Sequence, residues 1–170
     1  SGRIGVGVVP TAQYAHNLIQ IGHQATLGAN AALSATGQTF LTHNLYFDTG
    51  GTFRVFNTSN ANEGAIFRLV DGQLLFSNSA ATTGTPTVTE RFRITSAGSV
   101  GINSTSPDRR FTLHQDATCR MNLKSLSNST AGIEFGDEAD HNAGYIVYDN
   151  TNNSFQVGVN GTGEKLRINS

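Results

Sequence analysis

The sequence carries little charge, one cysteine and no long apolar run, and each shortage excludes a class of protein. Only 14% of the residues are charged and the formal net charge is -1, so no basic face is available for nucleic-acid phosphates. Cys119 has no second cysteine to pair with, so stability does not depend on an oxidising compartment, and we expect it to be a small buried side chain. No apolar run approaches the roughly 18 residues that span a bilayer, so membrane insertion is not expected.

Apolar residues are also scarce, at 37% of the chain. A compact monomer usually carries more than this. Disorder would bring few aromatic residues and a high net charge, whereas this chain has 10 Phe, 4 Tyr and almost no net charge. We therefore expect a fold that completes its hydrophobic core with other copies of the chain.

Helical periodicity is missing, and the alternation typical of strands takes its place. Asp71-Gly72 predicts a two-residue hairpin turn of type I′, because both turn positions need positive φ, and Asn160-Gly161 offers the same turn. An all-β fold is predicted. The alternating apolar residues include Ile4 and Val6, Ile19 and Ile21, Phe53 and Val55, Phe67 and Leu69, Phe92 and Ile94, Phe111 and Leu113, Met121 and Leu123, Ile133 and Phe135, Ile146 and Tyr148, Phe155 and Val157, and Leu166 and Ile168.

One cassette occurs twice in the chain. Residues 1–11 align with residues 97–108, with one residue inserted before the proline, and each copy precedes an apolar strand. A closing segment is also repeated, since residues 90–96 match residues 164–170. We therefore predict two tandem β-repeats, residues 1–96 and 97–170. Such an array extends by stacking and is not typical of an enzyme with a single site.

The joined segment at residues 90–107 resembles the repeat linker of tailed-phage tail fibres. In fibres of marine and freshwater phages, a strand of the form E-R-(apolar)-R-I is followed by G-x-V-G-I and then by Ser or Thr and Pro, as in ERFRI, GSVGI and SP here. Residues 132–137, 144–149 and 153–155 are similar to the repeat body of the same fibres. The resemblance implies an elongated homotrimeric β-fibre on a virion, assembled in the host cytoplasm, which contacts other tail proteins and supports host attachment.

Catalytic, cofactor and metal sites find little support in the sequence, and we expect no enzyme. The densest polar cluster, Asp137 to His141, would suit a hard cation or a pair of glycosidase acids, but a solvated acidic loop explains it more simply. Cys119 lies five positions after His114, and this odd spacing would place the two side chains on opposite faces of a strand. The glycines of the cassette are expected at turns or close backbone approaches, not at a phosphate site.

Loop aromatic residues suggest a second function, because exposed aromatic rings stack on sugars. Tyr46 and Phe56 are the candidate contacts with a host surface glycan, and Tyr14 and Tyr145 are also not obviously committed to a core. This alternative makes the segment a receptor-recognition module. A polysaccharide depolymerase and a bacterial surface adhesin are two further hypotheses.

Overall fold

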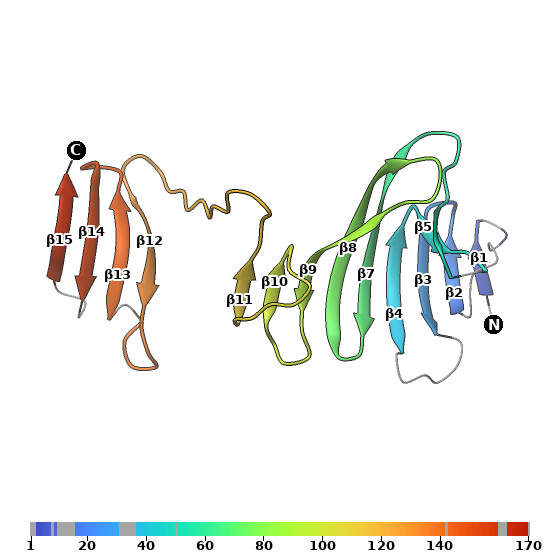
Figure 1. The fold of residues 1–170 in the computed structure, drawn as a ribbon, viewed down its shortest axis with the longest axis horizontal. Coiled ribbons are helices and arrows are strands. Elements are labelled where there is room, and N and C mark those ends of the chain that lie inside the picture. Colours follow the sequence, from blue (N-terminus) through green and yellow to red (C-terminus); the bar gives the residue numbers. More distant parts are fainter. Residues whose placement is uncertain are drawn as a thin grey trace. The chain divides into compact units, whose positions relative to one another are not determined.

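The computed structural model describes residues 3–7, 9, 16–30, 37–49, 51–141, 143–159 and 163–169. Every regular element in these residues is a β-strand, which confirms the all-β prediction. The chain divides into two compact units, Ser1–Cys119 and Arg120–Ser170 (Figure 1). This division differs from the repeat boundary predicted between residues 96 and 97, because the strands at residues 100–102 and 111–113 pair with the first unit.

The first unit is built on a nine-stranded sheet with the order β1-β2-β3-β4-β7-β8-β9-β10-β11. Neighbours pair antiparallel except at the two ends of the sheet, where β1 pairs parallel with β2 and β10 pairs parallel with β11. The strands are β1 (Arg3–Val6), β2 (His16–Ile21), β3 (Ala25–Asn30), β4 (Gln38–His43), β7 (Asn62–Val70), β8 (Gln73–Thr82), β9 (Val88–Ile94), β10 (Val100–Ile102) and β11 (Phe111–Leu113).

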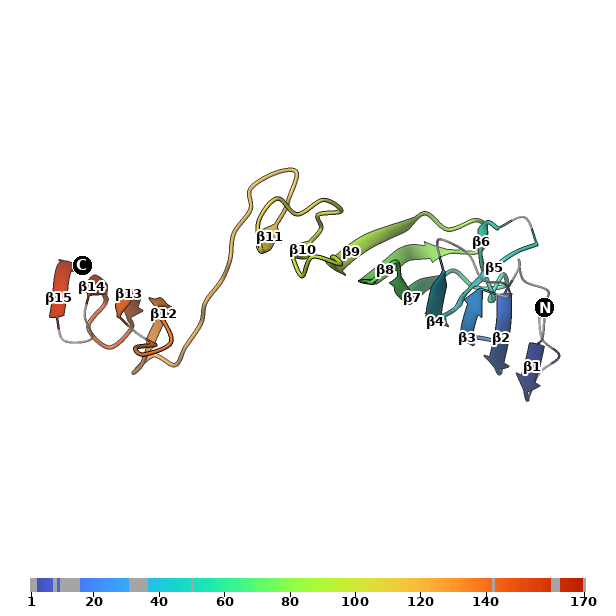
Figure 2. The same cartoon turned by 90° about the horizontal axis from the view of Figure 1, so that it is seen from below.

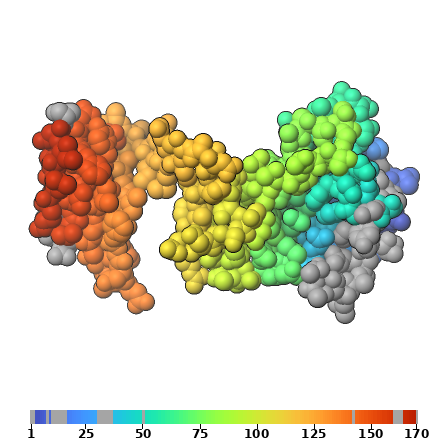
Figure 3. Space-filling model, in the orientation of Figure 1, coloured from blue at the N-terminus to red at the C-terminus, as the bar shows by residue number. Residues whose placement is uncertain are grey.

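A small hairpin covers part of one face of this sheet. It consists of β5 (Leu45–Phe47) and β6 (Phe53–Val55), which lie in front of the sheet in Figure 1 and above it in Figure 2. The space-filling view shows the same face, with the hairpin in cyan (Figure 3). The buried core lies between hairpin and sheet and contains Phe40, Leu45, Phe47, Val55 and Ile66.

Two glycines make room for this core. A Cβ atom at Gly28 would lie 2.5 Å from the ring of Phe40, its cross-strand partner, and one at Gly64 would lie 2.5 Å from Leu45. Both distances are far inside van der Waals contact, so only glycine lets these large side chains lie flat on the sheet. The core therefore depends on the lack of a side chain at Gly28 and Gly64 as well as on the large side chains of Phe40 and Leu45.

The second unit is a four-stranded antiparallel meander. Its strands are β12 (Thr130–Phe135), β13 (Gly144–Asp149), β14 (Ser154–Val159) and β15 (Gly163–Asn169). Each hairpin connection is local, so the order in the sheet follows the order in the sequence.

Several sequence predictions can be compared with this fold. The Asp71-Gly72 turn is confirmed, since it joins β7 to β8 with φ of 51° and 72°. The strand predicted at Met121 and Leu123 is wrong, because residues 114–129 contain no strand. Cys119 is exposed and not buried, with its thiol 3.6 Å from the carbonyl oxygen of Leu113. Tyr14 and Asn160-Gly161 lie outside the described residues.

Candidate functional site

A continuous row of large apolar side chains crosses all nine strands of the first sheet. Each member is the direct cross-strand partner of the next, through eight successive pairings. Because cross-strand partners point to the same side of a sheet, the whole row lies on one face. We call it row 1; it consists of Ile4, Ile19, Leu27, Leu41, Phe67, Phe76, Phe92, Ile102 and Leu113.

Row 1 lies on the side of the sheet opposite the β5–β6 hairpin. Phe40 and Ile66 point toward the hairpin and are each 1% exposed, whereas their chain neighbours Leu41 and Phe67 are 53% and 40% exposed. Alternation along each strand therefore separates a covered face from an uncovered apolar one. We call the uncovered side the open face.

A second row lies beside the first on the open face. From β7 to β11 it is wholly apolar, while on β2 to β4 it contains small or polar residues. Neither row contains Lys, Arg, Asp or Glu, whereas the opposite face carries Arg68, Glu90 and Arg93. Row 2 consists of Asn17, Ala29, Thr39, Leu69, Leu74, Ile94, Val100 and Phe111.

The second unit repeats the two rows. Ile133, Ile146, Val157 and Leu166 form one set of cross-strand partners, and Ala131, Tyr148, Phe155 and Ile168 form the next. Six of these eight side chains are large, apolar and markedly exposed. The meander β12–β15 thus presents the same kind of face as β4, β7, β8 and β9 of the first unit.

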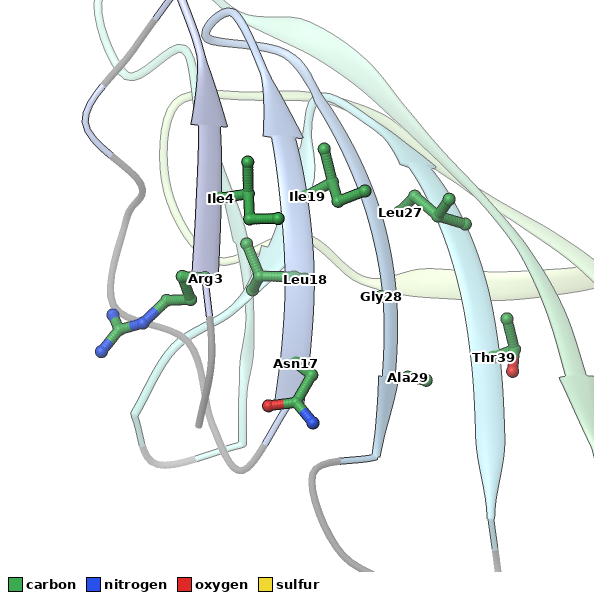
Figure 4. A pocket seen from close by; sticks show the side chains of 9 residues that line it. All are labelled: Arg3, Ile4, Asn17, Leu18, Ile19, Leu27, Gly28, Ala29 and Thr39. Atoms are coloured by element: carbon green, nitrogen blue, oxygen red, sulfur yellow. The ribbon is translucent and has the colours of Figure 1, made fainter.

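Hollows occur on these apolar faces in both units. One of about 580 Å³ lies over β1 to β4, where Ile4, Ile19 and Leu27 stand side by side on adjacent strands (Figure 4). A second, of about 450 Å³, is lined by Leu69, Leu74 and Ile94 of row 2. A third, of about 620 Å³ in the second unit, lies between the segment with Met121 and Leu123 and the face of β12 to β14. Exposed apolar patches of this extent mark interaction surfaces.

The closing strand has the same irregularity in both units. In β9, Phe92 and Glu90 face consecutive residues of β8, so Arg91 is an extra residue, and Lys165 is extra in β15 in the same way. Side chains of a regular strand alternate between its two faces, and the extra residue of a bulge shifts this alternation by one position. Residues three positions apart across the bulge therefore lie on the same face. Glu90 therefore reaches Arg93 at 2.7 Å, just as Glu164 reaches Arg167 at 2.8 Å.

These ion pairs affect both partners. The hydrogen bond from Arg93 to Glu90 raises the pKa of the Arg93 guanidinium, and the bond from Arg167 lowers the pKa of the Glu164 carboxyl. Arg93 also donates to Gln73 at 2.8 Å, and Arg167 donates to Ser154 at 3.4 Å from the equivalent position. Each arginine thus joins the closing strand to the neighbouring strand through a side-chain hydrogen bond.

The predicted glycan contacts lie together on the β5–β6 hairpin. The ring centroids of Tyr46 and Phe56 are 4.8 Å apart, and both side chains are half-buried. Arg54 faces Tyr46 across the hairpin, pairs with Asp48 at 2.9 Å and donates to Thr85. The hairpin thus places an apolar ring surface beside hydrogen-bonding groups of both kinds, a guanidinium that donates and a carboxylate that accepts.

The acidic loop is organised by its own backbone. The Asp137 carboxylate accepts the N–H groups of Ala139 at 2.8 Å and Asp140 at 3.0 Å, and these bonds lower its pKa. Among the described residues, no three or more His, Cys, Asp or Glu side chains are grouped so that they would hold a metal ion.

His114 and Cys119 have separate surroundings. The Nδ1 atom of His114 lies 3.2 Å from the carbonyl oxygen of Asn103, and its Nε2 atom lies 3.8 Å from Asp116. The thiol of Cys119 points instead to Leu113. These contacts are the local contacts of a loop.

Sequence reasoning did not find the two rows, although it identified most of their members as strand residues. Period-two alternation identifies which residues share a face within one strand. It leaves open which residue of the next strand lies opposite, and the rows depend on that register. The repeated E-x-x-R spacing was a usable signal for the bulges, since an ion pair at this spacing on a strand requires one.

Comparison of the chain with protein families, with curated proteins and with solved structures finds no match. Within the described residues, no helix is long and apolar enough to cross a bilayer.

Proposed function

We propose that this chain is a structural, non-enzymatic segment of a viral tail fibre or related virion appendage, and that it associates as a parallel homotrimer. The observation that carries the proposal is the open face, with a row of large apolar side chains on nine consecutive strands and no charged residue in either row. Fully burying such a side chain stabilises a protein by roughly 1.5–3 kcal/mol, so covering the face with other copies is strongly favoured.

The intrachain core explains why further copies are needed. Among the residues that the structure describes, seven apolar side chains are buried, whereas the exposed large apolar side chains are three times as numerous. A chain that buries so little of its apolar surface is marginally stable alone. Assembly and folding would then be one event, and the product would be a stiff rod that supports host attachment.

Two further features support tandem repeats of the fibre type. The pattern of apolar partners is the same in the two units, and the bulge with its Glu–Arg pair recurs in β9 and β15. The resemblance of residues 90–107 to tail-fibre linkers supplies the trimeric state, the virion location, assembly in the host cytoplasm and contact with other tail proteins.

The solution mass of the purified chain tests this proposal. Light scattering coupled to size exclusion is expected to give three times the chain mass of 18.0 kDa at micromolar concentration. A dimer would contradict the trimer, and a folded, monodisperse monomer would contradict the shared core altogether.

Recognition of a host glycan is the second candidate function, favoured by the pairing of Tyr46 with Phe56 beside Arg54. The rings would stack on the apolar face of a sugar, and Arg54 would donate to its hydroxyls. Replacing Tyr46 and Phe56 by alanine is expected to abolish signals on a glycan array and to reduce adsorption to host cells. Unchanged binding, or an array without hits for the unaltered chain, would reject this function.

A further inference from the structure

The two copies of the repeated cassette have different neighbours in the structure. Strand β10, in the second copy, lies between β9 and β11, whereas β1, in the first copy, pairs only with β2 among the described strands. Within the same described part of the chain, β15 pairs with β14 alone, although β9, which has the equivalent sequence, pairs with both β8 and β10. The sheets of the two units therefore each have an unpaired edge at a place where the other copy of the same sequence is paired.

The local geometry of β1 matches that of β10. Ile4, Gly5 and Val6 pair in parallel with residues 19–21, as Val100, Gly101 and Ile102 pair with residues 111–113. The backbone hydrogen bond that follows each strand pair is also equivalent. The N–H of Gly22 donates to the Val6 carbonyl oxygen at 2.9 Å, and the N–H of His114 donates to the Ile102 carbonyl oxygen at 3.0 Å. Gly7 and Asn103, which follow the two strands, both have positive φ.

The match extends to β15 and β9. The extra residue and the Glu–Arg pair occupy the same positions in both strands, as described above. On the paired edge of β9, the carbonyl oxygen of Arg91 accepts the N–H of Asn103 at 2.9 Å. A basic residue at the bulge is thus compatible with pairing on that edge, and Lys165 occupies this position in β15.

We propose that the free edge of β15 pairs antiparallel with β1 of a second copy of the chain. The pairing of β9 with β10 fixes the register, because Ile94 faces Val100, Arg93 faces Gly101 and Phe92 faces Ile102. In the proposed contact Ile168 faces Ile4, Arg167 faces Gly5 and Leu166 faces Val6. This contact joins copies end to end through strand edges, and it goes beyond the sharing of open faces.

Exposure at the two edges fits this occupant. Ile4, Val6, Leu166 and Ile168 are 60%, 54%, 51% and 58% exposed. The equivalent residues of the paired strands are less exposed, because the partner strand is in place. All four are half-buried: Phe92, Ile94, Val100 and Ile102. Pairing would also satisfy the unpaired N–H and C=O groups of both edges, and a free edge is a template for such addition.

Disulfide trapping between two different chains tests the contact and its register. In the β9–β10 pair, the hydrogen bonds at Thr95–Ser99 and Asn103–Arg91 make Ile94 and Val100 a non-hydrogen-bonded pair. The Cα atoms of such a pair lie about 4.5 Å apart, within the range that a disulfide bridges. One chain would carry Ile4→Cys and the other, with a tag that changes its mass, Ile168→Cys, both with Cys119→Ser.

Mixing and oxidising these chains is expected to give a mixed disulfide dimer. The control mixture combines Ile4→Cys with Leu166→Cys, whose cysteines are two residues out of register and beyond disulfide reach. We expect the in-register mixture to give about tenfold more dimer than this control. The second in-register pair, Val6→Cys with Leu166→Cys, should behave like the first. Equal yields from in-register and out-of-register mixtures would overturn the proposal. Circular dichroism of each reduced variant checks folding, and all four positions that receive a cysteine are exposed enough to accept it.

The same samples separate this inference from the proposed function. Light scattering under reducing conditions reports the sharing of open faces, which needs neither cysteine. Shared faces give masses in multiples of three chains, whereas pairing of strand edges alone would add chains one at a time. A trimer without register-specific crosslinks would reject the edge contact alone. Register-specific crosslinks between chains that are otherwise monomeric would reject the shared core and leave the edge contact standing.

Discussion

Asn44 shows how much one polar residue organises in this fold. It is fully buried, has a φ of 53°, and lies between β4 and β5. Its side chain donates to the Glu63 carbonyl oxygen at 3.1 Å and accepts the Asn57 N–H at 3.0 Å, while its own N–H bonds to Gln24 at 2.6 Å. The hairpin is therefore attached to three neighbouring segments through a residue type that tolerates left-handed backbone.

Replacing Asn44 by alanine is expected to lower the free energy of unfolding by about 2–4 kcal/mol, because it removes the partner of two part-buried backbone groups, the Glu63 carbonyl and the Asn57 N–H, and strains the backbone. Asn44→Gly loses the same hydrogen bonds but keeps the conformation, so we expect it to cost about 1 kcal/mol less. Urea unfolding at one fixed protein concentration measures both. Equal losses of unfolding free energy in the two variants would show that the left-handed backbone of Asn44 carries no strain cost. No loss in either variant would show that the hydrogen bonds of Asn44 do not stabilise the fold.

Asp149 offers a test by pH. Its carboxylate accepts the Asn152 side-chain N–H at 2.7 Å and the backbone N–H groups of Thr151 and Asn152, and the Asn152 side chain is the largest cause of its lowered pKa. Because the folded-state pKa lies below the ordinary 3.8, these bonds stabilise the fold above that pH. The stabilisation is lost as the pH falls through the folded pKa.

Carboxyl-carbon NMR is expected to show Asp149 titrating below 3.8, with Asn152→Ala moving the midpoint upward toward that value. The matched control is Asn122→Ala, on an exposed segment elsewhere in the second unit, which should leave the midpoint unchanged. A midpoint that Asn152→Ala does not move would assign the shift to another cause.

At the scale of the element, the crossover between β10 and β11 depends on a close backbone approach. A Cβ atom at Gly101 would lie 2.5 Å from the carbonyl oxygen of Ser104, and backbone cannot rotate away as a side chain can. The parallel pairing of Val100 with Phe111 requires the chain to turn back this tightly. The glycine of the cassette is thus explained by packing, as the sequence suggested.

Gly101→Ala is expected to destabilise the chain by about 2 kcal/mol through this overlap. Gly84→Ala is the matched control, since its nearest neighbour would be the Thr82 hydroxyl at 3.9 Å and the site is exposed. Thermal unfolding of both variants compares the two sites. Similar melting temperatures would show that the crossover has room for a side chain.

Local pattern predicted the elements of this fold better than their partners. Alternation and the Asp71-Gly72 turn predicted the β7–β8 hairpin, because turn and strands lie within one short window. The parallel pairing of β1 with β2, and the separate β5–β6 hairpin, depend on contacts outside any such window. Met121 and Leu123 alternate as strand residues do, but their segment has no neighbouring strand to pair with. Their alternation therefore indicates only that the two side chains lie on the same side of the chain, where both line the hollow over β12 to β14.

The candidate sites divide in the same way. Tyr46 and Phe56 were selected as loop aromatics, and the hairpin brings their rings together, but the sequence did not indicate Arg54 beside them. The open face was anticipated only as a shortage of apolar residues. Its residues could not be assigned without the register of eight strand pairs.

At the scale of the whole molecule, the open face predicts that one charge disrupts assembly. Phe67 lies in the middle of row 1, is 40% exposed and is not part of the buried core, so Phe67→Asp removes no core contact within the chain but would bury an unpaired carboxylate between copies. We expect association to weaken about a hundredfold or more.

Light scattering of Phe67→Asp should then give a mass near 18.0 kDa under conditions where the unaltered chain is trimeric. Thr58→Asp adds the same charge in an exposed loop between β6 and β7 and should leave the mass unchanged. If both variants associate alike, the open face is not the interface.

The lack of charge in rows 1 and 2 determines how a contact between two such faces would respond to temperature and salt. Association through such rows is driven by the release of water from apolar surface, which weakens on cooling, and not by Coulomb attraction, which salt screens. Copies joined in this way would hold together in sea water as firmly as in fresh water, and would separate first in a cold, dilute solution.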